Sequence, residues 1–267
     1  MTDALDEHPL SLPDALRPWI ADIESVSAEG ELPKAFTHVP DTATKVVVRV
    51  EDTGRRDALV VGPRTRASYH AEAGKRVVSC VRMRLEPGTV GPLFGARAAD
   101  LVGQVVPLGE LPTGTARRLA AELIDLAPDE MPAHLAKLLP SRPAPAADRS
   151  RALLLRAAVD ALSTRPGRTA SQVQDVAREL AVSERQLRNL FAEGVGLSPK
   201  HYVRIDRVRH VLHHATQAPW AELAATTGYY DQSHMTHDFR TLMGVPPRSF
   251  FTGRLPRARP CQAFSRG

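Results

Sequence analysis

The sequence has little of what marks a metal site, a disulfide scaffold or a membrane protein. Its two cysteines, Cys80 and Cys261, are too far apart for a CxxC zinc site and do not suggest a disulfide framework. No apolar run approaches the ~18 residues that a membrane span needs. The N-terminal stretch MTDALDEHPL is acidic and has no apolar core, unlike a secretory signal. These absences predict a cytoplasmic protein without a membrane partner.

The common motifs of enzymes are also missing. The sequence contains no GxSxG, P-loop, HExxH or GxGxxG motif. His210 and His214 have the i, i+4 spacing of a helical metal site, but no third ligand accompanies them. His38 and His70 stand alone in the first half of the chain. We therefore expect no catalytic residues, no metal and no cofactor, and a protein that is not an enzyme.

What the sequence does have is an uneven distribution of charge. Residues 1–150 carry 18 basic and 21 acidic side chains, whereas residues 151–253 carry 13 and 9. The last 14 residues add four arginines and no acidic residue. The C-terminal part is thus the basic part, as expected of a segment that meets a polyanion, although a surplus of this size is common on surfaces without such a partner.

A proline-rich stretch divides the chain. LPSRPAPAADRS, residues 139–150, places Pro140, Pro143 and Pro145 within six residues. Such a stretch is stiff and extended, and it cannot continue a helix. We expect an N-terminal domain over 1–139, a linker over 140–149, a helical domain over 150–253 and a basic, disordered tail over 254–267.

Before the linker, β-rich runs come first and helical patterns follow. The runs cover residues 34–39, 45–52, 57–62, 66–73 and 75–86. Turn formers separate them, and this spacing predicts a small antiparallel barrel of the cupin type or a sandwich. The side chains expected to line its apolar interior, packed or around a ligand, are Val46, Val48, Val78, Cys80 and Met83. Later amphipathic patterns predict helices near 96–104, 113–126 and 131–139.

After the linker every pattern is helical, and one arrangement occurs twice. In the first copy, a short helix over 172–181 ends at a break at Ala181-Val182, and a second helix follows over 184–195. Ser183 and Gln186 have the spacing of a capping box, which marks the start of that second helix. In a helix–turn–helix motif, the second helix presents its first turns to the major groove of DNA.

The second copy begins 47 to 48 residues later. Pro219 starts a short helix, and Gly228 can take the left-handed conformation that ends it. Asp231 is a good N-cap for the next helix, over 232–243. The apolar stripe expected to be buried consists of Met235, Phe239 and Leu242.

A longer helix connects the two copies. Ser198 as N-cap and Pro199 as first residue predict its start, and the pattern continues to His214. Its ~16 residues span ~24 Å, which could hold two recognition helices near one duplex turn apart, ~34 Å. This helix carries the arginines Arg204, Arg207 and Arg209. We expect their side chains to be either solvated or directed toward phosphates.

Polar stripes on the second helix of each copy are the candidate DNA-binding residues. They are Arg185, Arg188 and Asn189 in the first copy, and Gln232, Ser233, Thr236, His237 and Arg240 in the second. The candidate phosphate contacts are Ser183, Lys200 and Arg204. On an isolated helix such a stripe would be an ordinary solvated face. Within a duplicated helix–turn–helix with caps in place, DNA is the favoured partner.

Two segments, GLSPKHYVRIDRVRHV and ELAATTGYYDQSHMTHDFRTLMGVPPRSFF, closely resemble the DNA-binding domain of the AraC/XylS family of bacterial transcription regulators. The resemblance covers about residues 150–252 and includes the DQSH motif and the Gly-x-Pro-Pro sequence at 244–247. It implies that the polar stripes contact the bases of double-stranded DNA. Asn189 and His237 stand where many members are expected to have Arg. Since Asn pairs best with adenine and Arg with guanine, the operator cannot be taken from relatives.

The resemblance also implies a role for the N-terminal domain. In this family such a β unit senses a ligand, mediates dimerisation, or both. Residues 82–111 resemble the end of the barrel and the first helices of such sensory domains. A small-molecule effector and a second copy of the chain are thus expected partners. The helices over 115–139 are the expected dimer face, which gel filtration showing only monomer would contradict.

We therefore expect an α+β protein of two domains. The first is a small antiparallel β-barrel with helices that regulates or dimerises, and the second is all-α with two helix–turn–helix motifs joined by a long helix. The expected function is sequence-specific transcription regulation. Two other classes stay open. One is a small-molecule-binding barrel protein or barrel enzyme whose helical half is an adaptor, and the other is an architectural DNA binder with little preference between sites.

Overall fold

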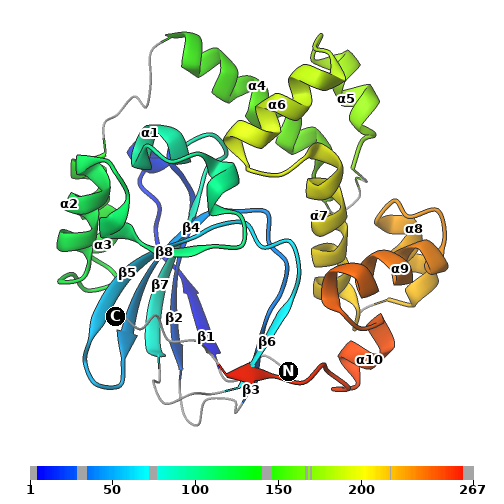
Figure 1. Cartoon of the computed structure of the whole chain (residues 1–267), viewed down its shortest axis with the longest axis horizontal. Coiled ribbons are helices and arrows are strands. Elements are labelled where there is room, and N and C mark those ends of the chain that lie inside the picture. The colour runs from blue at the N-terminus through cyan, green and yellow to red at the C-terminus, as the bar shows by residue number, and fades with distance from the viewer. Residues whose placement is uncertain are drawn as a thin grey trace.

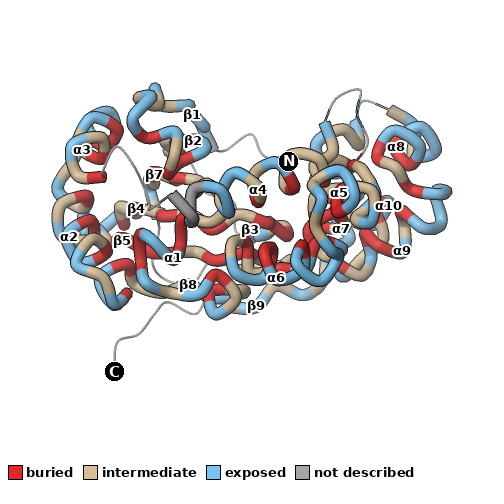
Figure 2. The backbone as a smooth tube through the Cα atoms, turned by 90° about the horizontal axis from the view of Figure 1, so that it is seen from above, coloured by how far each residue is buried: buried red, intermediate tan, exposed pale blue. Residues whose placement is uncertain are grey.

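The computed structural model describes residues 5–28, 35–71, 77–139, 146–165, 168, 170–216 and 218–260. Within them, an antiparallel β unit with helices is followed by a unit of seven helices and one short last strand (Figure 1). Each unit has its own hydrophobic core. Two helices of the first unit, residues 114–123 and 131–138, lie at one end of the molecule, and the last three helices, within residues 220–251, lie at the other (Figure 2). The predicted fold class is confirmed.

The larger sheet has six antiparallel strands in the order β1-β2-β7-β4-β5-β8. The strands are β1 (Leu5–Pro9), β2 (Ile20–Ala28), β4 (Lys45–Glu51), β5 (Arg56–Val61), β7 (Val77–Leu85) and β8 (Val105–Pro107). The β-rich runs predict β4, β5 and β7 but not the other three. In β2 the buried residues Ile20, Ile23 and Val26 are three apart, and the register shifts between Ile20 and Asp22. This spacing hides the alternation by which a strand is recognised.

The alternation of side chains places the apolar interior on one face of the larger sheet. Val46, Val48 and Met83 are buried in the first core, as predicted. The prediction is wrong for Val78 and Cys80, since Val78 is exposed and Cys80 lies outside this core. The buried face of β7 instead carries Val81, Met83 and Leu85, and even-numbered residues of the strand point to the other face.

A smaller sheet pairs a strand close to residue 260 with strands of the first unit. It consists of β3 (Ala35–His38), β6 (Ser68–Ala71) and β9 (Arg259–Pro260), with β6 in the centre. β3 pairs with β6 in antiparallel fashion, and β9 pairs with β6 in parallel. The prediction of a disordered tail is therefore wrong as far as Pro260, because its backbone pairs with a strand of the first unit. Residues 261–267, with Cys261, lie outside the described residues.

Three α-helices accompany the larger sheet. They are α1 (Val90–Phe94), α2 (Gly114–Leu123) and α3 (Met131–Leu138). Leu119 and Leu123 of α2 and Leu135 of α3 are buried in the first core, together with Trp19 and Phe94. Where a helix is predicted near 96–104, the structure has a short 3-10 helix, Ala98–Leu101. α2 and α3 fall in the expected dimer face over 115–139, which stays a prediction.

The second unit consists of helices packed around Phe191, Ile205 and Phe239. They are α4 (Ala146–Leu162), α5 (Val173–Glu179), α6 (Glu184–Gly194), α7 (Pro199–His214), α8 (Trp220–Thr226), α9 (Gln232–Met243) and α10 (Pro247–Phe251). α4 begins inside the predicted linker, so the linker prediction is wrong over 146–149. Alanine after the last proline favours a helix, and an acidic residue suits its first turn. Residues 140–145 lie outside the described part of the chain.

The two units contact each other along several segments. Val39, Ala67 and Val102 of the first unit pack against the core of the second. Backbone hydrogen bonds cross between Gly88 N and Gly194 O (2.9 Å) and between Ala67 N and Leu242 O (2.7 Å). Gly196, with φ +86°, lies so close that a Cβ would be 2.5 Å from the Ala98 carbonyl oxygen. Both the backbone conformation and this close approach require glycine there.

Candidate nucleic-acid interface

The first helix–turn–helix motif consists of α5 and α6. Ala181 takes a left-handed conformation with φ 54°, which turns the chain between the two helices. Ser183 then forms the predicted capping box with Gln186, whose N–H donates to Ser183 Oγ at 3.1 Å and whose Oε1 accepts from the Ser183 N–H at 2.8 Å. Leu187, Leu190 and Phe191 are buried, so the orientation of α6 is fixed. The remaining face of α6 is directed outward.

The second motif, α8 and α9, repeats this construction. Gly228 has φ 74° directly after α8, as its position in the sequence predicts. Asp231 caps α9, and its Oδ1 accepts a hydrogen bond from the His234 N–H at 2.7 Å. The predicted stripe of Met235, Phe239 and Leu242 is buried. Both recognition helices are therefore started by a side-chain cap and held by three apolar residues.

α7 joins the two motifs as one uninterrupted helix. It begins at Pro199, and the Ser198 hydroxyl accepts from the His201 N–H at 3.3 Å. Ile205, Val208 and Val211 are fully buried, which ties α7 to the same core as both motifs. At 1.5 Å per residue its 16 residues span about 24 Å. The two motifs are thus parts of a single packed body.

The predicted DNA-binding side chains lie on the open faces of α6 and α9. Arg185, Arg188 and Asn189 are exposed on α6. On α9, Thr236 is partly buried, and the exposed side chains are Gln232, Ser233, His237 and Arg240. Within the described part of the chain none of these residues is held in an ion pair, and Arg188 Nε donates only to the Glu184 carbonyl of its own helix, at 3.3 Å. These side chains are available to a partner.

Comparison with known proteins agrees with this geometry. The model of a family described as a helix-turn-helix domain matches residues 176–253. This part of the chain is an AraC-type helix-turn-helix domain. No curated protein sequence matches the chain significantly.

Several solved structures are similar to the chain. The C-terminal domain of AraT, a response regulator from Geobacillus stearothermophilus, is 21% identical, with a TM-score of 0.31, over 45% of this chain and 95% of that one. An AraC-type regulator from Chromobacterium violaceum is 23% identical, with a TM-score of 0.32, over 41% and 96%. ToxT from Vibrio cholerae O395 is 10% identical, with a TM-score of 0.40, over 94% and 98%.

The arginines of α7 have partners inside the chain, which the sequence patterns do not indicate. Arg204 Nη2 lies 2.8 Å from Oδ1 of the buried Asp238 on α9. Arg207 lies over the ring of Tyr229, 5.4 Å from its centroid. Arg209 Nη1 donates to the Pro40 carbonyl at 3.2 Å. Arg204 is thus held by Asp238 while its side chain stays 38% exposed. Ser183, Lys200 and Arg204 all stay predicted phosphate contacts.

Asp41 connects the AraC-type domain to the larger sheet. Its buried carboxylate forms an ion pair with Lys45 and lies 3.3 Å from Arg209 of α7 and 3.8 Å from Arg84 of β7. Burial by itself would raise the pKa of Asp41. The positive charges of Lys45, Arg209 and Arg84 outweigh burial and hold that pKa well below its usual range. The carboxylate is thus charged throughout the neutral range and links α7 to β7.

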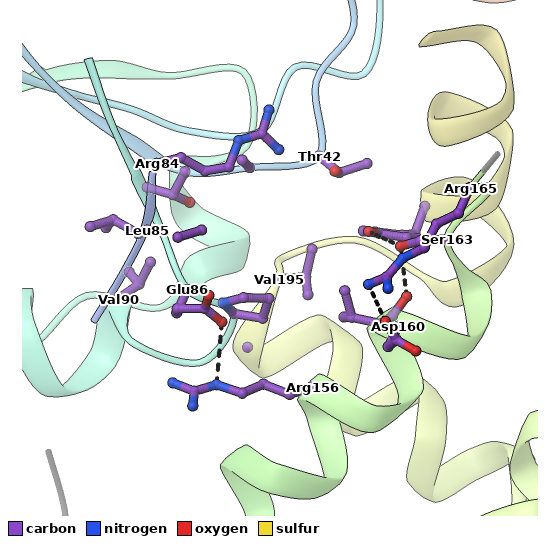
Figure 3. A pocket seen from close by; sticks show the side chains of 17 residues that line it. Thr42, Arg84, Leu85, Glu86, Val90, Arg156, Asp160, Ser163, Arg165 and Val195 are labelled. Carbon is purple, nitrogen blue, oxygen red and sulfur yellow. Dashed lines mark hydrogen bonds and ion pairs between the residues drawn. The ribbon is translucent and has the colours of Figure 1, made fainter. Parts of the chain in front are cut away.

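A cleft of about 450 Å³ opens between the second unit and the larger sheet (Figure 3). The sheet side contributes Arg84, Leu85 and Glu86, and the helical side contributes Asp160, Ser163, Arg165 and Tyr202. Arg156 of α4 spans the cleft to Glu86 at 3.3 Å, and Arg165 pairs with Asp160. The Ser163 and Tyr202 hydroxyls are 2.9 Å apart. The walls are therefore mixed in polarity, with arginines from both units.

Some features of the interface are not evident from the sequence. Sequence patterns indicate neither this cleft nor the contact between Asp41 and Arg209, because their residues come from distant segments. They also pass over Tyr230, which is 94% exposed beside α9, although its place directly before a predicted N-cap is a usable signal. In the described part of the chain, no group of three or more His, Cys, Asp or Glu is placed to hold a metal. No described helix is long and apolar enough to cross a bilayer.

Proposed function

We propose that the protein is a cytoplasmic, sequence-specific regulator of transcription whose α6 and α9 enter two successive major grooves of double-stranded DNA. The observation that supports this most is the pairing of two capped recognition helices through one continuous helix, α7, inside a single core. Each recognition helix leaves its first polar turns exposed. An adaptor for another protein would not need two equivalent polar helices of this kind.

The side chains on the two helices suit the reading of bases. Arg185 and Arg188 carry the planar fork that pairs with guanine, whereas Asn189 and Gln232 match adenine. Ser233, Thr236 and His237 lie along the same side of α9, with Arg240 one turn further. Lys200, at the start of α7, is exposed and suits a phosphate. We propose that phosphate contacts supply affinity and these side chains supply sequence preference.

Selection of bound fragments from genomic DNA tests the proposed function. The purified chain should enrich a small set of fragments at near-physiological salt, and binding should be about 10³-fold or more tighter than to a scrambled duplex. Affinity should also fall steeply with salt as phosphate counterions are released. Equal enrichment of all fragments would favour an architectural DNA binder. No binding to any duplex would favour the adaptor.

We also propose that the first unit modulates DNA binding through an effector in the cleft. The cleft touches β7, α4 and the ends of α6 and α7, so a ligand there would contact the sheet and the AraC-type domain together. Its lining carries three arginines, Arg84, Arg156 and Arg165, against the two carboxylates Glu86 and Asp160, and this surplus of positive charge favours a small organic acid.

Thermal unfolding with a panel of small organic acids tests the cleft. A binder at 100 times its Kd should stabilise the protein by ~2.7 kcal/mol, which raises Tm by a few degrees. Arg165→Gln should weaken this effect. Arg151→Gln removes an exposed arginine that pairs with Glu193 outside the cleft, and it should leave the effect intact. If no acid moves Tm, or if both variants respond like the wild type, the cleft is not the effector site.

A further inference from the structure

Two adjacent tyrosines in the second helix–turn–helix motif have opposite environments. Tyr229 is 5% exposed, with its ring under Arg207 and edge-on to His234 at 5.3 Å between centroids. Tyr230 is 94% exposed. The turn at Gly228 and the hydrogen bond from Tyr229 N to Ala224 O (2.9 Å) fix this orientation. Because Tyr229 is directed into the core, its neighbour is directed into solvent.

The position of Tyr230 is more informative than its exposure alone. It directly precedes Asp231, the N-cap of α9, and so it immediately precedes the first turn that carries Gln232 and Ser233. Figure 1 places this turn, between α8 and α9, on the side of the AraC-type domain that faces away from the sheets. In the residues described, no hydrogen bond or ring contact within the chain involves Tyr230. A large aromatic side chain is thus left to solvent at the edge of the proposed DNA surface.

We propose that Tyr230 is a DNA contact, and that its hydroxyl donates a hydrogen bond to a backbone phosphate oxygen at the edge of the groove that α9 enters. The proposal rests on the proposed function. A phenol is a neutral donor at physiological pH, and tyrosine is among the side chains that bind phosphate and sugar atoms. Such a contact fixes the register of α9 on the duplex and carries no sequence information.

This chemistry gives the contact a signature of its own. A lysine or arginine on a phosphate displaces a counterion, so its removal lowers the slope of log K against log salt by about one. A neutral hydroxyl displaces none. Its loss therefore weakens binding by the same factor at every salt concentration, and on cognate and scrambled duplexes alike.

The experiment compares Tyr230→Phe with Tyr229→Phe in the full chain. Each removes one phenolic oxygen. The Tyr229 hydroxyl is buried without a hydrogen-bond partner among the described residues, so its loss should affect neither folding nor DNA binding. Tyr230→Phe should bind both duplexes about tenfold more weakly, since hydrogen bonds to charged groups are among the stronger ones. The salt slope should stay at the wild-type value. Lys200→Ala serves as the contrast and should lower it.

Three results would overturn the proposal. Wild-type affinity of Tyr230→Phe would show that the hydroxyl makes no contact. A loss confined to the cognate duplex would place the hydroxyl on a base and not on a phosphate. An equal loss in Tyr229→Phe would trace the effect to the turn. If the wild type itself binds no duplex, the proposed function fails first, and the role of Tyr230 fails with it.

Discussion

The double variant Arg188→Ala, Gln232→Ala is expected to lose about a hundredfold of its preference for cognate over scrambled DNA. Each recognition helix would lose one fork-shaped or amide side chain, and a good bidentate pair contributes ~1–3 kcal/mol of discrimination. Both residues are exposed, so the fold should be unchanged. The measurement is equilibrium binding to the selected fragment and to a scrambled duplex at one salt concentration.

The single variants Arg188→Ala and Gln232→Ala test whether α6 and α9 contact bases in two separate major grooves. Arg188 and Gln232 lie on different helices, so their effects on binding free energy should add if each helix contacts its own groove. Arg178→Ala is the matched control, because Arg178 is an exposed arginine of α5 that pairs with Asp175. It changes the net charge by the same amount as Arg188→Ala and should leave the preference intact. An unchanged preference in the double variant would reject base reading by α6 and α9.

Asp41→Asn is expected to lower the free energy of unfolding by about 3 kcal/mol at neutral pH, because it leaves partly buried cations without their partner. The folded-state pKa of Asp41 is depressed below its unfolded value. Its contribution is therefore present above the unfolded pKa of about 3.9 and is lost as the pH falls through the still lower folded pKa. Urea unfolding should be measured at several pH values for the wild type and Asp41→Asn. The difference in their free energies of unfolding should be constant near neutrality and should become smaller below about pH 4.

A double-mutant cycle that combines Asp41→Asn with Arg209→Gln isolates the contact between the units, Asp41–Arg209. It distinguishes this contact from the Asp41–Lys45 ion pair within the first unit. The two substitutions should be non-additive, since Asp41 and Arg209 are 3.3 Å apart. Asp57→Asn provides a control, because Asp57 and Arg49 pair across neighbouring strands of one sheet. It should show no coupling to Arg209. Additive effects of Asp41→Asn and Arg209→Gln would mean that this contact does not hold the units together.

The sequence predicts the AraC-type domain well because its signals are local. The Ser183 capping box, the Ser198–Pro199 start and the Asp231 cap each depend on residues within one turn of a helix, and all three occur in the structure. Strands depend on partners that are distant in sequence. The buried face of β7 and the existence of β1 and β2 follow from pairing that no short window contains. Composition alone makes the last residues look disordered, yet β9 finds its partner far back in the chain.

Local sequence patterns predict which side chains of a helix are exposed, but not which partners they meet. The polar stripes of α6 and α9 can be predicted from helical periodicity, and their exposure follows. The intramolecular partners of Arg204, Arg207 and Arg209 cannot be predicted in this way, since Asp238, Tyr229 and Asp41 belong to other segments of the chain than α7. A charged side chain on a predicted helix is therefore a weak guide to DNA contact until its neighbours in space are known.

The parallel pairing of β9 with β6 has a consequence for how such a protein is made and how it could diversify. β6 ends at Ala71 and β9 lies at Arg259–Pro260, so the smaller sheet stays incomplete until the residues up to Pro260 have been synthesised and have left the ribosome. Recombination that exchanged the first unit for another would also remove the partner of β9. The two units are thus expected to be inherited together, and a chimaera should need its last strand taken from the same parent as β6.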